Sequence, residues 1–255
     1  MLHYRNGGFR SGGVNLDPAQ PAFRYGAGFF ETLYYNGSGV CHLERHLDRL
    51  FHGLRAFDIG YESVDFPGVV GEVLERNGLT GRPARVNIFY PIEEGGARPV
   101  VLAAPHDPQP RKTYRLCRCT DHHVSTLNGM KTTSYMFFHL ALKRARDEGY
   151  DDVALTDFDG GLLETATGAL LLAEGDGFVE METPFRLPSI ALDLARTVLA
   201  ISPRPVNVAD LSRFRHAYVL NSLVGMRPVV AIGEYAFAPD ESACGRVVPL
   251  VLGDG

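Results

Sequence analysis

The order of hydrophobic and polar residues predicts a strand followed by a long helix near the start of the chain. Residues 29–35 are mostly aromatic or β-branched, and Asn36-Gly37 after them is typical of a two-residue hairpin turn. Residues 43–57 place leucine and phenylalanine at helical spacing, which predicts a helix with one apolar stripe. Arg49 lies away from the centre of that stripe.

The rest of the chain mixes strands and helices without a repeating strand–helix–strand order. Helices are expected at 69–76, from just beyond Lys131 to 148, and at 189–200. Strands are expected at 84–90, 99–104, 114–120, 152–156, 163–164, 169–173, 178–182 and 217–220. These elements predict an α/β protein of the α+β type.

The length of 255 residues is enough for one large domain or two smaller ones. Residues 106–112 contain two prolines and several charged or titratable side chains, which is typical of a segment that connects two domains. We therefore expect an N-terminal α/β domain over 1–110, a connecting segment over 111–125 and a C-terminal domain over 126–255.

Composition points to a globular protein rather than to a nucleic-acid or membrane protein. The hydrophobic content of 45% and the charged content of 22% are ordinary, and the net charge of -5 provides no basic surface for nucleic acid. The first residues lack the apolar core of a signal peptide, and no run reaches the roughly 18 apolar residues of a membrane span. We expect a cytoplasmic protein.

The cysteines do not suggest a metal site. There are 4 of them, and only Cys117 and Cys119 are close in sequence, within an alternating strand pattern. Neither has histidine or cysteine partners at the spacing of metal ligands, so reduced thiols and no metal are expected.

Lysine is rare in this chain and therefore informative. Among the 25 basic residues only Lys112, Lys131 and Lys143 are lysines. Lys131 lies in an uncharged run, 126–135. Arginine stays protonated, whereas a desolvated lysine can lose its proton and attack a carbonyl. The alternative is an ordinary surface lysine.

Other candidate residues are weak when each is taken alone. Glu164 is an acid in a strand that is otherwise uncharged, so it is either exposed or held by a cation. Ser189 follows Pro188 at a predicted helix start, where unpaired amide groups can face an anion. Ser222 follows Asn221 in what could be a plain turn, and Arg49 on its helix could be solvated.

Together, these segments resemble the class IV aminotransferase family, the fold-type IV group of pyridoxal phosphate (PLP) enzymes. The resemblance runs from Tyr25 to Pro228 and rests on six segments in the right order. They are 25–32, His46 to Leu50, Lys131 with Tyr135, Glu164 before a strand of small residues, 187–190, and 220–223.

The resemblance implies a role for each polar candidate. Lys131 matches the lysine that forms the Schiff base with PLP and shuttles the substrate proton. Glu164 matches the carboxylate that keeps the pyridine nitrogen protonated, so that the ring withdraws electrons. Arg49 matches the phosphate-binding arginine, since its planar donors suit a dianion.

The remaining roles also come from the resemblance. Ile190 and Ala191 match the helix amides that bind the phosphate, Ser222 matches a hydroxyl ligand of it, and Tyr135 matches a tyrosine facing the ring hydroxyl. The positions that line the substrate pocket in the family are Tyr25, Glu31 and Tyr34.

The chain departs from the family pattern in three places. Residues 187–192 read Leu-Pro-Ser-Ile-Ala-Leu where relatives commonly have Leu-Pro-Gly-Ile-Thr-Arg, and residues 183–186 before them form a shortened segment. Residues 89–91 replace a frequent Arg-Gly, and residues 26–28 replace a frequent Gly-Asp-Gly. The backbone amides at 190 and 191 are retained, so phosphate binding is still expected.

Three functions are compatible with this resemblance. The compact length and the Phe-Glu-Thr after a Gly-x-Gly loop look closest to aminodeoxychorismate lyase, which releases 4-aminobenzoate and pyruvate in folate biosynthesis. A branched-chain or D-amino-acid aminotransferase is the alternative. The altered sequence at 187–192 suggests a third possibility, a non-catalytic homologue that acts as a scaffold. A homodimer acting on a small amino-acid or aminodeoxychorismate substrate is implied.

Overall fold

The computed structural model describes residues 1–253, which form two compact units. Unit 1 consists of Met1–Pro108 together with Met130–Tyr135, and unit 2 consists of Gln109–Gly129 together with Met136–Gly255. The segment Met130–Tyr135, which carries Lys131, therefore packs with unit 1 although it lies beyond the expected connecting segment.

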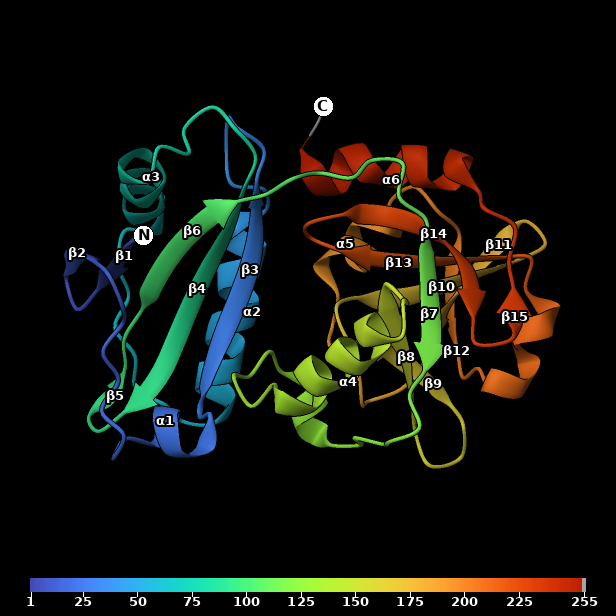
Figure 1. Ribbon diagram of the computed structural model, residues 1–255, viewed down its shortest axis with the longest axis horizontal. Coiled ribbons are helices and arrows are strands. Elements are labelled where there is room, and N and C mark those ends of the chain that lie inside the picture. Colours follow the sequence, from blue (N-terminus) through green and yellow to red (C-terminus); the bar gives the residue numbers. More distant parts are fainter. Residues whose placement is uncertain (254–255) are drawn as a thin grey trace. The chain divides into compact units, whose positions relative to one another are not determined.

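Unit 1 is built on one antiparallel sheet with the strand order β2-β1-β6-β4-β3 (Figure 1). Its strands are β1 (Leu2–Arg5), β2 (Gly8–Ser11), β3 (Gly28–Tyr35), β4 (Ala84–Glu93) and β6 (Val100–Pro105), with the short β5 (Gly96–Ala97) paired to β4. The predicted strands at 29–35, 84–90 and 99–104 are confirmed.

One face of this sheet is covered by α2 (Leu43–Ala56) and α3 (Phe66–Arg76), while the short α1 (Pro21–Tyr25) precedes β3. The core between sheet and helices contains Leu33 of β3, Leu50 and Leu54 of α2, and Val73 of α3, all at most 2% exposed. The predicted helix at 43–57 is confirmed. The helix predicted at 69–76 begins earlier, at Phe66, because the Asp65 side chain caps it by accepting a hydrogen bond from the Gly68 N–H.

The prediction of a hairpin at Asn36-Gly37 was only half right. The turn forms, since the Asn36 side chain accepts hydrogen bonds from the N–H groups of Ser38 and Gly39, each at 2.9 Å. No second strand follows, because after a single bridge between Tyr35 and Val40 the chain enters α2. The strand that pairs with β3 is β4.

Unit 2 contains a larger sheet that curls on itself, with the strand order β12-β11-β10-β13-β14-β7-β8-β9 (Figure 1). The outer strand β9 also contacts β10 and β11, which gives the sheet the shape of a half-barrel. The strands are β7 (Tyr114–Arg118), β8 (Asp152–Thr156), β9 (Leu162–Thr165), β10 (Ala169–Glu174), β11 (Gly177–Met181), β12 (Ile201–Arg204), β13 (His216–Asn221) and β14 (Gly225–Ile232), with β15 (Tyr235–Ala236) beside β14.

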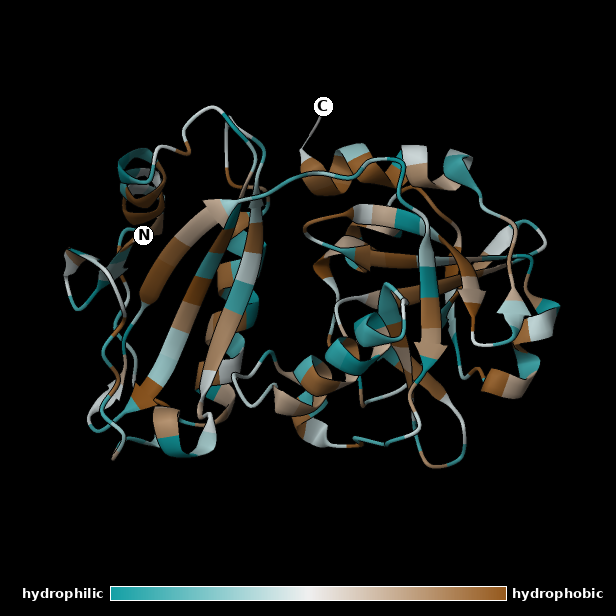
Figure 2. Ribbon diagram, viewed as in Figure 1, coloured by the Kyte–Doolittle hydropathy of each residue, from teal (hydrophilic) through white to brown (hydrophobic). Residues whose placement is uncertain are grey.

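Hydrophobic residues concentrate on the central strands of the half-barrel, where β10 and β13 are mostly brown in Figure 2. Leu170, Leu172 and Val219 are at most 1% exposed. Three helices accompany this sheet, α4 (Met136–Asp147), α5 (Ile190–Ala195) and α6 (Glu241–Leu252), together with the 3-10 turns η1 (Thr126–Gly129) and η2 (Val208–Arg213). Strand β14 and helix α6 did not appear among the predicted elements.

Two predicted helices of unit 2 differ in length from the observed ones. The helix expected just beyond Lys131 begins only at Met136, because the intervening residues pair with β3 of unit 1. The helix expected over 189–200 ends at Ala195, and the next residues form tighter turns in which Val198 N–H donates to the Ala195 carbonyl. None of the helices within residues 1–253 combines the length and apolar character that crossing a membrane requires.

Candidate functional site

The segment that carries Lys131 is attached to the free edge of β3. The N–H of Phe30 donates to the carbonyl of Lys131, and the N–H of Thr133 donates to the carbonyl of Gly28, each at 2.9 Å. Phe29 and Thr132 form an antiparallel bridge between these two bonds. The main chain of Lys131 is therefore fixed by β3 as firmly as a short strand would be.

Gly28 is required for this close approach. A Cβ atom at Gly28 would lie 2.7 Å from the carbonyl oxygen of Tyr90 and 2.9 Å from the hydroxyl of Thr133. That hydroxyl also donates a 2.5 Å hydrogen bond to the carbonyl of Gly26, which has a φ of 62°. The Gly-x-Gly loop at 26–28 thus provides the space in which the lysine segment lies.

The side chain of Lys131 lies against aromatic rings. Its Nζ is 4.8 Å from the centre of the Phe30 ring and 5.8 Å from that of Tyr135. The Phe30 and Tyr135 rings meet edge to face at 5.5 Å, and Phe30 stacks on Phe89 of β4 at 5.7 Å. Lys131 as a residue is half-buried, and its amine lies near aromatic rings, whose faces attract a cation.

On the opposite, helix-facing side of β3, Glu31 forms a buried ion pair with Arg49 of α2. The Nε and Nη2 groups of Arg49 donate to the two carboxylate oxygens, each at 2.7 Å. His46, one helical turn earlier, places its Nδ1 2.7 Å from the same carboxylate. Glu31 and His46 are 0% and 1% exposed, so this cluster lies inside unit 1.

The cluster shifts the acidity of its members. Burial alone would raise the pKa of Glu31, but the Arg49 charge and the hydrogen bonds from His46 and Arg49 outweigh it and lower the pKa to about 2. The pKa of His46 is lowered, chiefly by burial, and the charges of Arg49 and Lys131 act in the same direction. Glu31 is therefore an anion and His46 a neutral hydrogen-bond donor.

The other two expected substrate-pocket residues of unit 1 have different surroundings. Tyr25 ends α1 and is 63% exposed, with the guanidinium of Arg24 over its ring at 5.0 Å. Tyr34 is 4% exposed, and its ring meets that of His106 edge to face at 5.6 Å.

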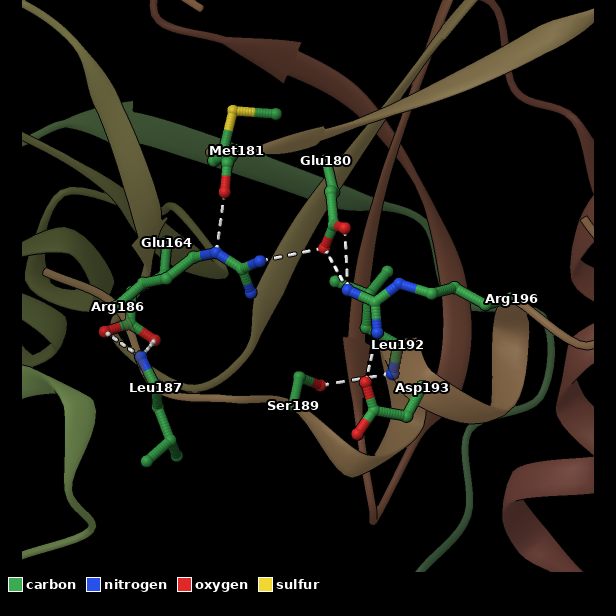
Figure 3. Close-up of polar contacts among 9 residues, drawn as sticks. All are labelled: Glu164, Glu180, Met181, Arg186, Leu187, Ser189, Leu192, Asp193 and Arg196. Atoms are coloured by element: carbon green, nitrogen blue, oxygen red, sulfur yellow. Dashed lines mark hydrogen bonds and ion pairs between the residues drawn. The ribbon is translucent and has the colours of Figure 1, made fainter. Parts of the chain in front are cut away.

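In unit 2, Glu164 on β9 holds the chain just before α5. Its two carboxylate oxygens lie 3.3 Å from the N–H of Leu187, as Figure 3 shows. The side chain is largely buried, at 8% exposure of the residue. This contact connects the acid expected at the pyridine nitrogen with the segment expected at the phosphate.

The same segment is held from its other side by Glu180 of β11. Arg186 donates from Nη2 to Glu180 at 2.8 Å and from Nε to the carbonyl of Met181 at 2.7 Å (Figure 3). Arg196, at the end of α5, donates to both oxygens of Glu180 at 2.6 and 2.5 Å. One buried carboxylate thus holds Arg186, at the end of the shortened segment, and Arg196, directly after α5.

The start of α5 retains the features expected from the sequence. Ser189 is the N-cap, and its hydroxyl accepts a hydrogen bond from the N–H of Leu192 at 3.2 Å. Ile190 and Ala191 occupy the first turn, whose N–H groups have no acceptor within the helix itself. The Ser189 hydroxyl therefore accepts from the amide of Leu192 and not from the amides of Ile190 and Ala191.

Ser222 follows β13 in a turn organised by Asn221. The Asn221 side chain accepts from the N–H groups of Leu223 and Val224, each at 3.0 Å, and donates to the carbonyl of Thr167 at 3.2 Å. Thr167 belongs to the β9–β10 turn that follows Glu164. Helix α5 also packs against β13. Glu164, the α5 start and Ser222 are thus connected within unit 2.

A buried acid that the sequence did not single out supports this turn. Asp152 is 0% exposed and accepts hydrogen bonds from the hydroxyls of Thr165 and Thr167 at 2.9 and 2.5 Å. Burial raises the pKa of its carboxyl, although these hydrogen bonds and that of Val153 N–H oppose the shift. Asp152 fixes the two threonines that flank the turn after Glu164.

The candidate residues therefore form two sets, one in each unit. Unit 1 brings together Lys131, Tyr135 and, across β3, Glu31 with Arg49. Unit 2 brings together Glu164, the pair Ile190 and Ala191, and Ser222. His46, Asp152 and Glu180 were missed as supporting residues. His46 offered a signal, since it lies one turn from Arg49 on the same helix.

Comparison with known proteins places the chain in a family. The sequence model of the class IV amino-transferases matches residues 28–232, most of the chain, and the chain belongs to this family. Enzymes of the family are PLP-dependent transferases and lyases, and the expected family and cofactor are confirmed. No curated protein is similar enough in sequence to count as a match.

Several solved structures share the fold. A branched-chain aminotransferase from Thermoproteus uzoniensis, with norvaline, has a TM-score of 0.88 at 16% identity, covering 99% of this chain and 95% of that one. A hypothetical aminotransferase from Mycobacterium tuberculosis, in its PLP-bound form, has 0.84 at 20%, covering 100% of both. A putative 4-amino-4-deoxychorismate lyase from Legionella pneumophila has 0.83 at 17%, covering 95% and 96%. The fold-type IV architecture expected from the sequence is confirmed.

The donor groups of the two units fit PLP in kind. Unit 1 contains an amine at Lys131 and a guanidinium at Arg49, and unit 2 contains a carboxylate at Glu164; these are the kinds of group that would bind an aldehyde, a phosphate and a ring nitrogen. Ser222 and the first turn of α5 add a hydroxyl and backbone amides of the type that bind phosphate. Within residues 1–253, no group of three or more His, Cys, Asp or Glu side chains is arranged to hold a metal ion.

Proposed function

We propose that the chain is an aminodeoxychorismate lyase that releases 4-aminobenzoate and pyruvate. The observation that carries this proposal is the stacked pair Phe30 and Phe89 beside the amine of Lys131. This flat aromatic surface suits a substrate with a six-membered ring, because planar groups stack favourably on aromatic side chains. Residues 89–91 stand where many relatives have an Arg-Gly, so the proposed recognition here relies on an aromatic ring rather than on a cation.

Lys131 is the proposed catalytic residue. PLP, when bound, supplies an aldehyde that condenses with amines and a ring that withdraws electrons from the substrate carbon. The Lys131 amine would hold the cofactor, and its free Nζ would be the base that removes the substrate Cα proton. Hydrogen bonds to β3 hold the main chain from which this side chain extends.

The other proposed roles follow from charge and hydrogen bonding. Glu164, held by the Leu187 N–H, keeps a proton on the ring nitrogen through its negative charge. Arg49, Ser222 and the amides of Ile190 and Ala191 bind the phosphate. Tyr135, edge-on to Phe30, faces the ring hydroxyl, and Tyr25 and Tyr34 line the substrate side.

The direct test is a product assay. The purified protein with PLP is incubated with aminodeoxychorismate, and 4-aminobenzoate and pyruvate are measured. In parallel, amino transfer to a keto acid is measured with branched-chain L-amino acids and with D-amino acids. Equal release of the two products in the first assay is expected. Amino transfer without release of 4-aminobenzoate would instead identify an aminotransferase, the second candidate.

The aminotransferase candidate has its own support. The apolar surface of Phe30 and Phe89 also accepts an aliphatic side chain, and the branched-chain enzyme of Thermoproteus uzoniensis shares the fold. A non-catalytic homologue is the third candidate. It predicts no product in either assay although PLP binds.

We also propose that the protein works as a homodimer in the cytoplasm, since the family completes its active site with a neighbouring subunit. Sedimentation at micromolar concentration tests the assembly. A single species with the mass of one chain, 28.0 kDa, contradicts the dimer.

A further inference from the structure

We propose that Glu31 is a positioning residue that orients the guanidinium of Arg49 for a phosphate group, with His46 as its second support. The expectation from family resemblance placed Glu31 in the substrate pocket instead. The inference rests on the proposed function in one respect, namely that Arg49 binds the phosphate of PLP.

The geometry of the Glu31–Arg49 pair fixes the guanidinium rather than only attracting it. The carboxylate accepts from Nε and from Nη2, which are the two donors along one edge of the planar group. Two parallel bonds along one edge prevent rotation of that plane. Glu31 thus holds the guanidinium through Nε and Nη2.

Glu31 is placed for this task and not for contact with a substrate. Alternation along β3 directs its side chain toward α2, whereas Phe30 and Thr32 lie on the other face. The residue is 0% exposed, and both carboxylate oxygens accept hydrogen bonds from α2 side chains. A substrate group would have to displace Arg49 or His46 to reach it.

His46 keeps the carboxylate from turning. Its Nδ1 lies 2.7 Å from Oε2 of Glu31, the same oxygen that accepts from Arg49 Nη2. As a neutral donor the imidazole adds a hydrogen bond without adding charge. The net charge of Glu31, Arg49 and His46 together is therefore zero. We infer that the cluster aids phosphate binding by orienting the Arg49 guanidinium.

Orientation has a measurable consequence for affinity. An arginine side chain that is mobile before binding must be ordered when the ligand arrives, and this ordering weakens the observed affinity. An arginine that Glu31 already holds in the folded protein loses little further conformational entropy when the ligand binds. Loss of the clamp should therefore weaken binding of ligands that carry a phosphate and leave other ligands unaffected.

The experiment compares PLP with pyridoxal, which has the same ring and aldehyde but no phosphate. Apoenzyme is titrated with each compound, and binding is followed by the visible absorbance of the lysine adduct. For Glu31→Gln we expect the PLP affinity to fall by about tenfold to a hundredfold, the effect of losing charge-assisted hydrogen bonds. The pyridoxal affinity should stay at the wild-type value.

A second variant separates orientation from charge. Glu31→Gln removes a negative charge near the phosphate, so a purely electrostatic effect would tighten PLP binding. Glu31→Asp keeps the charge but is one methylene too short for the two-bond contact, and orientation predicts weaker PLP binding here too. The matched control is Glu93→Gln, which removes the acid of another Arg–Glu pair in unit 1, Arg5 with Glu93. It should bind both compounds like the wild type.

The outcomes are distinguishable. Unchanged or tighter PLP binding in both Glu31 variants overturns the inference, and so does an equal loss for PLP and pyridoxal. If Glu31→Gln does not fold, Glu31→Asp provides the same comparison. Arg49→Ala is measured alongside. If it leaves the PLP affinity unchanged, the proposed phosphate role of Arg49 fails. If it weakens PLP while the Glu31 variants do not, only the positioning role fails.

Discussion

Lys131 and Phe30 are joined twice, once through the main chain and once through the side chains. The Phe30 N–H donates to the Lys131 carbonyl at 2.9 Å, and the Lys131 Nζ lies 4.8 Å from the centre of the Phe30 ring. A lysine side chain has many rotamers, and an aromatic surface beside its attachment point reduces their number. Phe30 of β3 therefore contacts both the main chain of Lys131 and its amine.

Replacing this lysine should remove covalent cofactor binding. We expect Lys131→Ala to abolish the visible absorbance band of the lysine adduct and to lower kcat by a factor on the order of 10³ to 10⁶, as for other catalytic nucleophiles. Borohydride reduction of the wild-type holoenzyme followed by peptide mass spectrometry should locate the cofactor on Lys131. The control is Lys143→Ala, since Lys143 is exposed and pairs with Asp147 on α4. A band that survives Lys131→Ala would refute the assignment.

Gly28 should tolerate no side chain. In Gly28→Ala the new Cβ would lie 2.7 Å from the Tyr90 carbonyl oxygen, so the sheet or the lysine segment must shift. We expect the free energy of unfolding to drop by about 1–3 kcal/mol, the usual effect of overpacking. The rate of adduct formation with PLP should fall as well.

The control for this substitution is Gly39→Ala in the turn after β3. A Cβ at Gly39 has no atom within 4 Å. We expect a change of less than about 0.5 kcal/mol in its unfolding free energy. Equal losses of unfolding free energy in the two variants would show that the close contact at Gly28 is not the cause of the destabilisation.

The elements found from the sequence are those with strong local signals. The helix around Leu50 and the strand around Val86 were placed within a few residues, since their periodicity persists over several turns or residue pairs. The predicted hairpin at Asn36 failed because the turn signal is local, whereas the partner of β3 is chosen by the core it shares with β4. The helix after Ser189 was too long for a similar reason, as its last residues lead directly into β12.

The candidate site was recoverable only in part from the sequence. Lys131 and Glu164 stood out because a charge in an uncharged stretch is visible in the sequence alone. The supporting roles of His46 and Asp152 were missed because these roles depend on partners in other segments of the chain. Glu31 lies 15 residues from His46, and Thr165 lies 13 residues from Asp152. Burial of polar groups is a property of the folded cluster, and no single segment reveals it.

Glu164 should act through its charge rather than through its shape. Glu164→Gln keeps an oxygen that can accept from the Leu187 N–H, so the fold of the segment should be retained. The ring nitrogen of the cofactor would lose its anionic partner, and we expect kcat to fall about tenfold to a hundredfold, the worth of a charge-assisted hydrogen bond. Thermal unfolding of the apoenzyme should match the wild type. A variant with normal kcat would exclude the proposed role.

The lowered pKa of Glu31 makes the stability of the protein depend on pH in a defined window. The pKa of Glu31 falls from 4.5 to about 2 on folding. The ionised carboxylate therefore contributes its full stabilisation of the folded state above pH 4.5, and this contribution is lost as the pH falls toward 2. The shift corresponds to about 3 kcal/mol. We expect urea unfolding of the wild type to show this loss between pH 4.5 and 2, and Glu31→Gln to lack it. The control is Glu174→Gln, since the pKa of Glu174 is also lowered but the side chain is partly exposed beside Arg204. Its pH curve should follow the wild type, and parallel curves for the wild type and Glu31→Gln would contradict the buried ion pair.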